Sequence, residues 1–293
     1  MRLGLDLGGT KIEGIILEPD GREIFRHRVA TEQEKGYDAI LNRLRQVYQT
    51  LVLEIRGRDH TLGIGTPGAI SHRTGLLKNS NTVCLNERLS VPVLQQLLEH
   101  DFVIENDANC FALAEARLGA GCGKDLVFGV IMGTGCGGGL VINGQVRTGL
   151  QKIAGEWGHM VIDPAGPLCY CGQRGCVETL ISGGGLEKRY TELTGEKRKL
   201  SEIAEDARRG HDQAKDFMKT FLAHYGRAIA NLINILDPDI VVLGGGVSNL
   251  DELYDQGYAE IRRQVFSDSL ETPVVRHALG DSAGVIGAAL IGK

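Results

Sequence analysis

The feature that most constrains the fold is a glycine-turned hairpin that occurs twice along the chain. Residues 3 to 19, "LGLDLGGTKIEGIILEP", read as a strand, a glycine turn and a second strand, and residues 127 to 144, "VFGVIMGTGCGGGLVING", follow the same pattern. The glycines that align are Gly4 with Gly129, Gly8 with Gly133 and Gly14 with Gly139. A repeat on this scale predicts two halves of common design, although any glycine-turned hairpin would share the coarse pattern.

Helical and strand patterns alternate around these hairpins and predict an α/β fold. "REIFRHRVA" adds a third antiparallel strand to the first hairpin, and apolar residues at spacings of three and four predict an amphipathic helix at 37–55. The other predicted elements are helices at 91–100, 110–120, 213–236 and 282–292 and strands at 102–109 and 240–246. We expect one lobe at 1–117, completed by the closing helix 282–293, and a second lobe at 118–281.

Composition excludes several classes of partner. The chain of 293 residues has 32 basic and 37 acidic residues and a net charge of −5, which offers no general attraction to nucleic acid or anionic lipid. A strand pattern begins directly after Met1, and no apolar run is long enough to cross a membrane, so we expect a cytoplasmic protein without membrane contacts. Because cytosolic thiols are normally reduced, the seven cysteines do not predict a disulfide framework.

Three glycine-rich turns at strand ends predict a nucleotide site. In "DLGGTK" at 6–11 the backbone N–H groups can approach a phosphate while the carboxylate reaches Mg²⁺ or its waters, although a tight hairpin alone would also need glycine. "MGTGCGGG" at 132–139 and "LGGGVSN" at 243–249 supply two further turns, and the last could admit a base and ribose.

Polar clusters after two other segments are candidates for binding a hydroxylated ligand. "ENDAN" at 105–109 offers Asn106 and Asp107 for neighbouring hydroxyls, and a carboxylate there can act as a general base. The alternative is helix capping by Asp107 or Asn109. In "KNSN" at 78–81, Asn81 is either a sugar ligand or a turn residue.

The segment around "CYCGQRGC" at 169–176 predicts a structural zinc site. "EWGH" precedes it, so that His159, Cys169, Cys171 and Cys176 supply one imidazole and three thiols, the ligands that tetrahedral zinc prefers. The alternative is three unligated thiols beside an unrelated histidine. The other four cysteines, Cys84, Cys110, Cys122 and Cys136, are interpreted as small packing residues.

Taken in order, these motifs resemble the ROK family of repressors, uncharacterised reading frames and sugar kinases. The resemblance runs across essentially the whole chain and rests on "DLGGTKIE", "GIGTPG", "ENDANC", "GTGCGGG", "GEWGH", "CYCGQRGCVET" and "LDPDIVVLGGGVSN". It implies two α/β lobes with a ribonuclease-H-like core, as in actin, heat-shock chaperone ATPases and hexokinase, which close over sugar and ATP in a cleft. It further implies transfer of the γ-phosphoryl group of Mg-ATP to a hexose hydroxyl, usually at carbon 6, and a homodimer.

The resemblance also implies a role for each matching residue. Asp107 matches the catalytic base, and the sugar-binding groups correspond to Gly68, Asn81, Asn106, Asp107, Glu156, His159 and Glu178. The ATP-binding positions correspond to Asp6, Gly8, Gly9, Thr10, Lys11, Gly133, Thr134, Gly135, Gly244, Gly245 and Gly246. His159 would place one ring nitrogen on zinc and the other toward a sugar hydroxyl.

Several functions remain open within this resemblance. "GAISHRTGLLKNSNTVCLN" and "GEWGH" look most like the bacterial fructokinase and mannokinase branch, so fructose is the leading substrate. The alternatives are glucokinase, N-acetylglucosamine kinase and N-acetylmannosamine kinase. A non-catalytic sugar-sensing protein and an ATP-driven chaperone or filament are the rivals from other classes. A repressor is not expected, because the motif at Asp6 leaves no room ahead of it for a helix-turn-helix domain.

Overall fold

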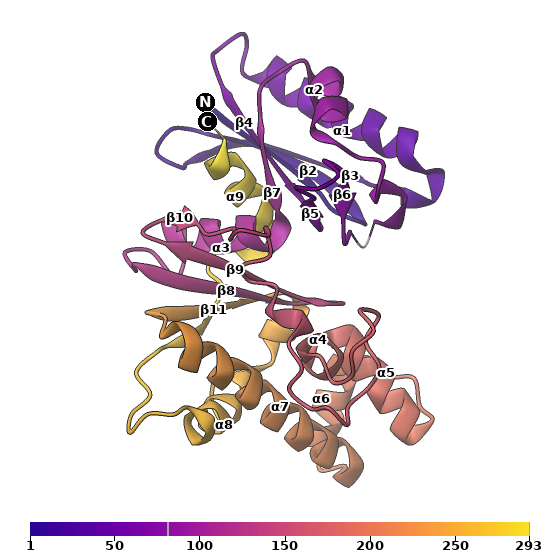
Figure 1. Cartoon of the computed structure of the whole chain (residues 1–293), viewed down its shortest axis with the longest axis vertical. Coiled ribbons are helices and arrows are strands. Elements are labelled where there is room, and N and C mark those ends of the chain that lie inside the picture. The colour runs from indigo at the N-terminus through magenta and orange to yellow at the C-terminus, as the bar shows by residue number, and fades with distance from the viewer. Residues whose placement is uncertain (81, 293) are drawn as a thin grey trace. The chain divides into compact units, whose positions relative to one another are not determined.

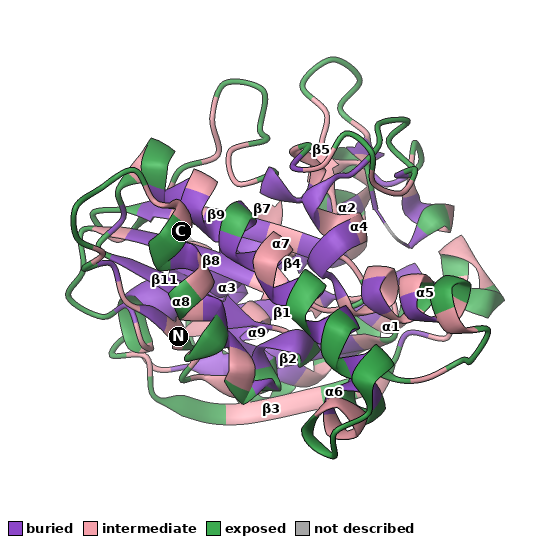
Figure 2. Cartoon of the chain, turned by 90° about the horizontal axis from the view of Figure 1, so that it is seen from below, coloured by how far each residue is buried: buried purple, intermediate pink, exposed green. Residues whose placement is uncertain are grey.

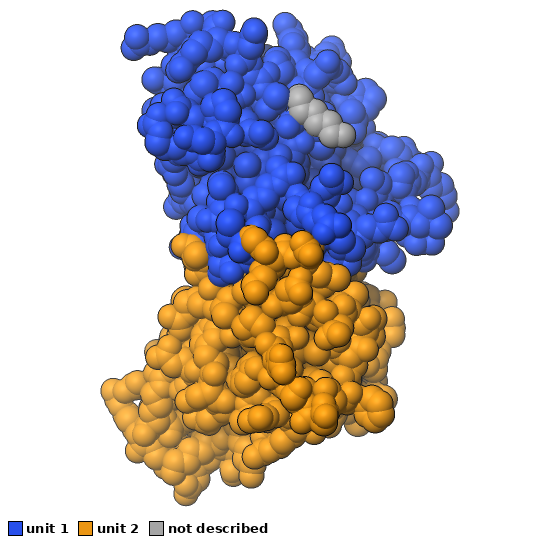
Figure 3. Space-filling view, turned by 90° about the vertical axis from the view of Figure 1, so that its left-hand side faces the viewer, with its two compact units in different colours: residues 1–122, 139–154, 279–293 blue, residues 123–138, 155–278 orange. Residues whose placement is uncertain are grey.

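The chain forms two compact units and contains two five-stranded sheets. The computed structural model describes residues 1–80 and 82–292. Unit 1 contains Met1–Cys122, Gly139–Ala154 and Leu279–Lys293, and unit 2 contains Gly123–Gly138 and Gly155–Ala278 (Figure 3). The lobe boundaries expected from the sequence, after residue 117 and before residue 282, stay a prediction.

The sheet of unit 1 begins with the predicted antiparallel meander. Its strands lie in the order β3-β2-β1-β4-β7. Their bounds are β1 Arg2–Leu7, β2 Lys11–Leu17, β3 Glu23–Ala30, β4 Thr61–Thr66 and β7 Val103–Asn106. β1 pairs antiparallel with β2 and parallel with β4, and β4 pairs parallel with β7. β3, at the edge, has no buried residue (Figure 2).

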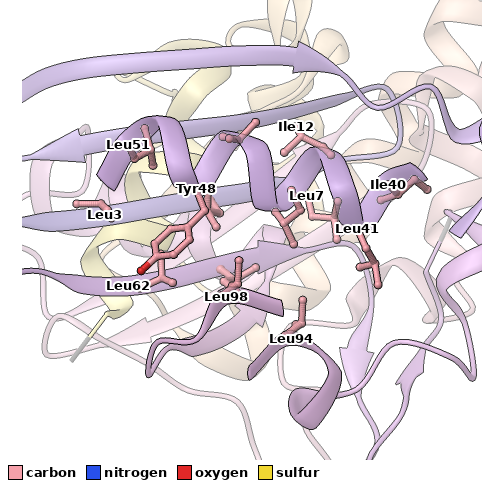
Figure 4. Close-up of a cluster of buried hydrophobic side chains, with 14 of the residues drawn as sticks. Leu3, Leu7, Ile12, Ile40, Leu41, Tyr48, Leu51, Leu62, Leu94 and Leu98 are labelled. Atoms are coloured by element: carbon pink, nitrogen blue, oxygen red, sulfur yellow. The ribbon is translucent and has the colours of Figure 1, made fainter. Parts of the chain in front are cut away.

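Alternation along β1 separates an apolar face from a polar one. Leu3, Leu5 and Leu7 are fully buried and belong to one core with α1 (Tyr37–Glu54) and α2 (Val91–Leu98) (Figure 4). Successive strand residues point to opposite faces, so Gly4 and Asp6 lie on the other face. That face is covered by α9 (Ala283–Ile291), and α3 (Asp107–Leu118) packs against α9.

Close backbone packing of α9 explains several glycines of unit 1. A Cβ at Gly63 would lie 1.8 Å from the Ala288 carbonyl oxygen, and one at Gly287 would lie 1.8 Å from the Cys110 carbonyl oxygen. Only a residue without a side chain can bring the two backbones this close. The small-residue helix predicted at 282–292 is therefore confirmed, and it packs within unit 1.

The second sheet repeats the strand order of the first. Its order is β10-β9-β8-β11-β12, with β11 parallel to both β8 and β12, and Figure 1 labels the first four of these strands. The bounds are β8 Leu126–Met132, β9 Cys136–Ile142, β10 Gln145–Val146, β11 Ile240–Gly244 and β12 Val274–Arg276, with the unit boundary inside β9. In both sheets a glycine-turned hairpin is followed by strands added beside its first strand, as the repeat predicts.

The helices of unit 2 are α4 Val177–Ile181, α5 Gly183–Thr194, α6 Leu200–Arg208, α7 Asp212–Leu236 and α8 Gln256–Gln264. The long helix predicted at 213–236 is confirmed as α7, and it buries Phe221 and Tyr225 completely. Within the described residues, no helix combines the length and the apolar character needed to cross a lipid bilayer. The remaining regular elements are the short strands β5 Ala69–Ile70 and β6 Leu77–Lys78 and single 3-10 turns.

Candidate active site

The first glycine turn, between β1 and β2 in unit 1, is held by backbone bonds and one threonine. The N–H of Gly8 donates to the Lys11 carbonyl at 3.0 Å. The hydroxyl of Thr31 donates to the Gly8 carbonyl at 2.7 Å, and the Thr31 N–H donates to the Thr10 carbonyl at 3.0 Å. Thr31 is fully buried. No motif singled out Thr31, because it reaches the turn from the end of the neighbouring strand.

Two acidic residues of the candidate site influence one another within unit 1. Asp6 is the last residue but one of β1, on the polar face of the sheet, and Asp107 opens α3. Burial, with the Asp107 carboxylate next in size, raises the pKa of Asp6 to about 7, against a smaller opposing effect of Lys11. The Asp6 side chain still reaches solvent in part. Two carboxylates in such surroundings are suited to share a proton or a divalent cation.

Asn106, rather than Asp107 or Asn109, caps helix α3. Its Oδ1 accepts the Ala108 N–H at 2.9 Å, and its Nδ2 donates to the Gly68 carbonyl at 3.1 Å. With this cap, α3 begins at Asp107 instead of the predicted residue 110. Two of the four hydrogen bonds that the Asn106 side chain can make are therefore formed inside the protein.

Gly68 occupies a backbone position that only glycine fits. Its φ is +83°, and a Cβ would lie 2.3 Å from the Lys78 carbonyl oxygen. The "GIGTPG" and "KNSN" loops thus approach each other closely at Gly68. Asn81, the other candidate on this side, lies outside the described residues. Glu105 was missed by the sequence reasoning, and its Oε1 accepts both the Asn106 N–H and an Asn109 amide N–H at 3.0 Å.

Lys11 is paired inside unit 1 with a buried carboxylate. Its Nζ lies 3.1 Å from Oε2 of Glu13, whose side chain is 1% exposed. Arg26 and Arg28 donate to Oε1 of Glu13 at 3.1 and 3.0 Å, and the Ser282 hydroxyl donates at 2.8 Å. Burial alone would raise the pKa of Glu13, but the hydrogen bonds from Arg28 and Ser282 and the charge of Lys11 lower it. The ion network fixes the strand after the glycine turn.

In unit 2, two glycine turns meet at the ends of adjacent parallel strands. β8 ends at Met132 and β11 at Gly244. Gly245 has φ +79°, and a Cβ on it would lie 2.5 Å from the Met132 carbonyl oxygen. A Cβ on Gly133 or Gly246 would meet no atom within 4 Å. The two predicted turns therefore touch at Gly245 and present an open, side-chain-free surface at Gly133 and Gly246.

A third glycine segment, which the sequence reasoning missed, packs on the same surface. The N–H of Gly183 donates to the Gly133 carbonyl at 2.8 Å. A Cβ on Gly184 would lie 2.5 Å from the Thr134 carbonyl oxygen. Gly184 also lines a cavity of about 550 Å³ along α5. "SGGG" at 182–185 was the available signal.

The predicted cysteine and histidine cluster is present in unit 2. One ligand atom from each of His159, Cys169, Cys171 and Cys176 lies within 4.8 Å of all the others. The Sγ atoms of Cys171 and Cys176 are 3.6 Å apart, and Nδ1 of His159 lies 3.6 Å from Sγ of Cys169. Tetrahedral zinc with bonds of about 2.3 Å to sulfur places its sulfur ligands about 3.8 Å apart. The donor set and its spacing fit a structural zinc ion.

The second ring nitrogen of His159 faces an aromatic side chain that was not predicted. Nε2 lies 3.0 Å from the Tyr170 hydroxyl, and the two rings meet edge to face. Tyr170 is 78% exposed. Although the side chain is largely exposed, partial loss of solvent around the hydroxyl, followed by the charge of Glu178, raises the pKa of Tyr170 to about 12, and Glu156 contributes to the same shift. Tyr170 therefore lies beside the predicted sugar-binding groups of unit 2.

Glu178 contacts the second glycine turn. Its Oε2 accepts the N–H of Cys136 at 2.9 Å. Trp157 anchors the "EWGH" segment nearby, because its indole N–H donates to the Gly137 carbonyl at 2.9 Å. Two segments that carry predicted sugar-binding groups are thus attached to the start of β9.

The two repeated sheets and these two sets of groups define a sugar kinase of the hexokinase type, and comparisons with known proteins agree. The model of the ROK family matches residues 2–293. The N-acetyl-D-glucosamine kinase of Mannheimia succiniciproducens is 35% identical over 306 residues, covering 99% of each chain. The N-acetylgalactosamine kinase of Shewanella sp. is 36% identical over 301 residues, covering 100% of this chain and 96% of the relative.

Solved structures give the same result. A ROK hexokinase from Thermus thermophilus superposes with a TM-score of 0.88 at 33% identity, covering 99% of this chain and 97% of that one. A ROK glucokinase from Streptomyces griseus, solved with glucose and AMPPNP, has a TM-score of 0.81 at 30% identity, covering 99% and 98%. The chain therefore belongs to the ROK family, and it is an ATP-dependent sugar kinase. The predicted fructokinase and mannokinase branch is not supported by these relatives.

Proposed function

We propose that the protein is an N-acetylhexosamine kinase that transfers the γ-phosphoryl group of ATP to the 6-hydroxyl of N-acetyl-D-glucosamine. The observation that carries this proposal is the similarity to N-acetyl-D-glucosamine kinases over 99% of both chains. A similarly identical N-acetylgalactosamine kinase makes that epimer the second candidate. Fructose, the leading substrate from sequence motifs, is accordingly replaced by an alternative that was already open.

Groups of unit 1 are suited to the chemical step. Asp107 accepts the proton of the attacking hydroxyl as general base, and Asn106 and Gly68 position that base through the cap of α3. The turn of Gly8, Gly9 and Thr10 contacts phosphate through its backbone. Asp6 fits Mg²⁺ or its waters, because a divalent cation would offset the burial and the repulsion from Asp107 that raise the pKa of Asp6. Bound magnesium would neutralise charge on the transferring phosphoryl group.

Groups of unit 2 are suited to hold the two substrates. The open surface at Gly133 and Gly246 admits the nucleotide. The residues next to it in the two turns also contact the nucleotide: Thr134, Gly135, Gly244 and Gly245. Glu156, His159 and Glu178 bind sugar hydroxyls beside the zinc loop. A zinc ion with four protein ligands has no open position for a water, so its role is to order this loop. A homodimer and a cytoplasmic location stay predictions.

A sugar panel tests the proposal. ADP release is measured with N-acetylglucosamine, N-acetylgalactosamine, N-acetylmannosamine, glucose, mannose and fructose, and each sugar is scored by kcat/KM. We expect N-acetylglucosamine to give the highest value, by at least tenfold over glucose, because a site that binds an acetamido group discriminates against a sugar that lacks it. A higher value for fructose or glucose would contradict the sugar assignment. Turnover with none of them would support a non-catalytic sugar sensor.

A further inference from the structure

The zinc-ligand cluster is connected to the second glycine turn by a short, rigid segment of unit 2. Cys176 directly precedes α4, and the side chains of Val177, Leu180 and Ile181 are completely buried. The Val177 N–H donates to the Met160 carbonyl at 2.9 Å, which ties the start of α4 to the residue after His159. Few internal motions are open to a segment held in this way.

The other end of this segment holds both sides of the turn at 133–136. On one side, Oε2 of Glu178 accepts the Cys136 N–H at 2.9 Å. On the other, the Gly183 N–H donates to the Gly133 carbonyl at 2.8 Å. Between them, a Cβ on Gly135 would lie 2.6 Å from the Glu178 carboxylate oxygen. Gly135 is therefore needed for the carboxylate to reach the turn.

We infer that the metal cluster sets the position of the nucleotide-binding turn through α4, with Glu178 as the positioning residue. The inference rests on the proposed function, since it takes the turn at 133–136 as part of the ATP site. It adds that zinc controls nucleotide affinity as well as the order of the sugar-binding loop. Without zinc, the segment after Cys176 loses its anchor, and the backbone N–H groups of the turn lose their fixed orientation toward phosphate.

The coupling is tested by measuring binding of a non-hydrolysable ATP analogue with magnesium, by calorimetry and without sugar. Zinc-loaded and zinc-stripped forms of the wild type are compared with the same two forms of Gly135→Ala, in which the added methyl group displaces the Glu178 carboxylate. We expect stripping to weaken binding about five- to tenfold in the wild type and less than twofold in Gly135→Ala, whose loaded form is already weakened. Equal losses in both proteins, or no loss in the wild type, would overturn the inference.

A second comparison needs no metal removal and so does not depend on the stability of the stripped protein. Glu178→Asp is one methylene too short to reach the Cys136 N–H, and it should weaken analogue binding about fivefold in folded, fully zinc-loaded protein. Glu178→Gln keeps a hydrogen-bond acceptor at full side-chain length, so its affinity for the analogue should fall less than that of Glu178→Asp. The matched control is Glu271→Asp, an exposed carboxylate elsewhere in unit 2, which should stay within twofold. Normal binding by loaded Glu178→Asp contradicts the coupling, whereas failure of the loaded wild type to bind the analogue contradicts the proposed function.

Discussion

The two glycine-turned hairpins share a sequence pattern but are held in place by different physical means. In unit 1 the turn after β1 is fixed by the Thr31 hydroxyl and by an ion network around buried Glu13. In unit 2 the turn after β8 is fixed by backbone packing at Gly245 and Gly183 and by one carboxylate, Glu178. The turn of unit 1 is thus held mainly by charged groups, and the turn of unit 2 is held mainly by close backbone contacts that glycine allows.

This difference indicates a division of tasks between the repeated halves. The charged half carries Asp6 and Asp107, to which we assign roles in phosphoryl transfer. The glycine turns of unit 2 offer backbone groups and an open surface, which suit a nucleotide. A repeat therefore conserves the hairpin while its surroundings determine what the hairpin does. Each of the following measurements tests one side of this contrast.

The largest effect is expected from Asp107→Asn. Loss of the general base should lower kcat by about 10²- to 10⁴-fold. Nucleotide affinity, which we assign to the turns of unit 2, should change by less than about threefold, a binding difference below ~1 kcal/mol. Steady-state kinetics and calorimetric titration measure the two quantities. Asp125→Asn, an exposed acid, is the control, and near-normal turnover by Asp107→Asn would refute the assigned base.

Glu13→Ala should destabilise unit 1 by about 1.5–3 kcal/mol, because it removes a buried acceptor from charged donors that can partly reach solvent. Since the pKa of Glu13 is lowered in the folded protein, its contribution is present at neutral pH and is lost as pH falls through that lowered value. Urea unfolding at neutral and acidic pH measures both. Glu23→Ala, which removes an exposed partner of Arg26, should cost less than about 1 kcal/mol. Equal costs would show that burial is unimportant here.

The charge contrast also predicts a pH profile. Because the pKa of Asp6 is raised to about 7, kcat/KM for Mg-ATP should rise with pH, by up to about tenfold per unit below pH 7, and then level off. The same shift means that the folding stability from protonated Asp6 is lost as pH rises through 7. In Asp6→Asn the rise near pH 7 should disappear along with most activity. An aspartate with its ordinary pKa of about 4 would stay ionised between pH 5.5 and 8. A flat wild-type profile of kcat/KM over this range would therefore contradict the role given to Asp6.

The smallest effect is expected in unit 2, from Tyr170→Phe. The Tyr170 hydroxyl lies 3.0 Å from Nε2 of His159, the nitrogen that we assign to the sugar. Removing this competing hydrogen bond should lower KM for the sugar about two- to tenfold and leave kcat unchanged. Tyr37→Phe is a control from unit 1. An increase in KM would mean that Tyr170 binds the sugar directly.

Local patterns in the sequence predicted elements and ligand sets, but not the long-range contacts that hold them. The spacing of His159, Cys169, Cys171 and Cys176 predicted a cluster that the fold brings within 4.8 Å. Thr31 and Ser282 have no local sequence signature, because each contacts a residue that is distant in the sequence. Thr31 donates to the Gly8 carbonyl, and Ser282 donates to Glu13. Asn106 is the helix cap because strand β7 ends there, three residues before the predicted end of the strand at residue 109. The sugar itself depends on contacts that no motif reports.

The position of α9 has a consequence for how the protein is made. Gly4, near the beginning of the chain, packs so closely on α9 that a Cβ there would lie 2.4 Å from the Val285 carbonyl oxygen. A ribosome exposes the N-terminal strands many seconds before it synthesises residues 283–291, at about 5–20 residues per second. Until then the polar face of the first sheet has no cover. Strands β1 and β4 can therefore complete their packing only after residues 283–291 have been made.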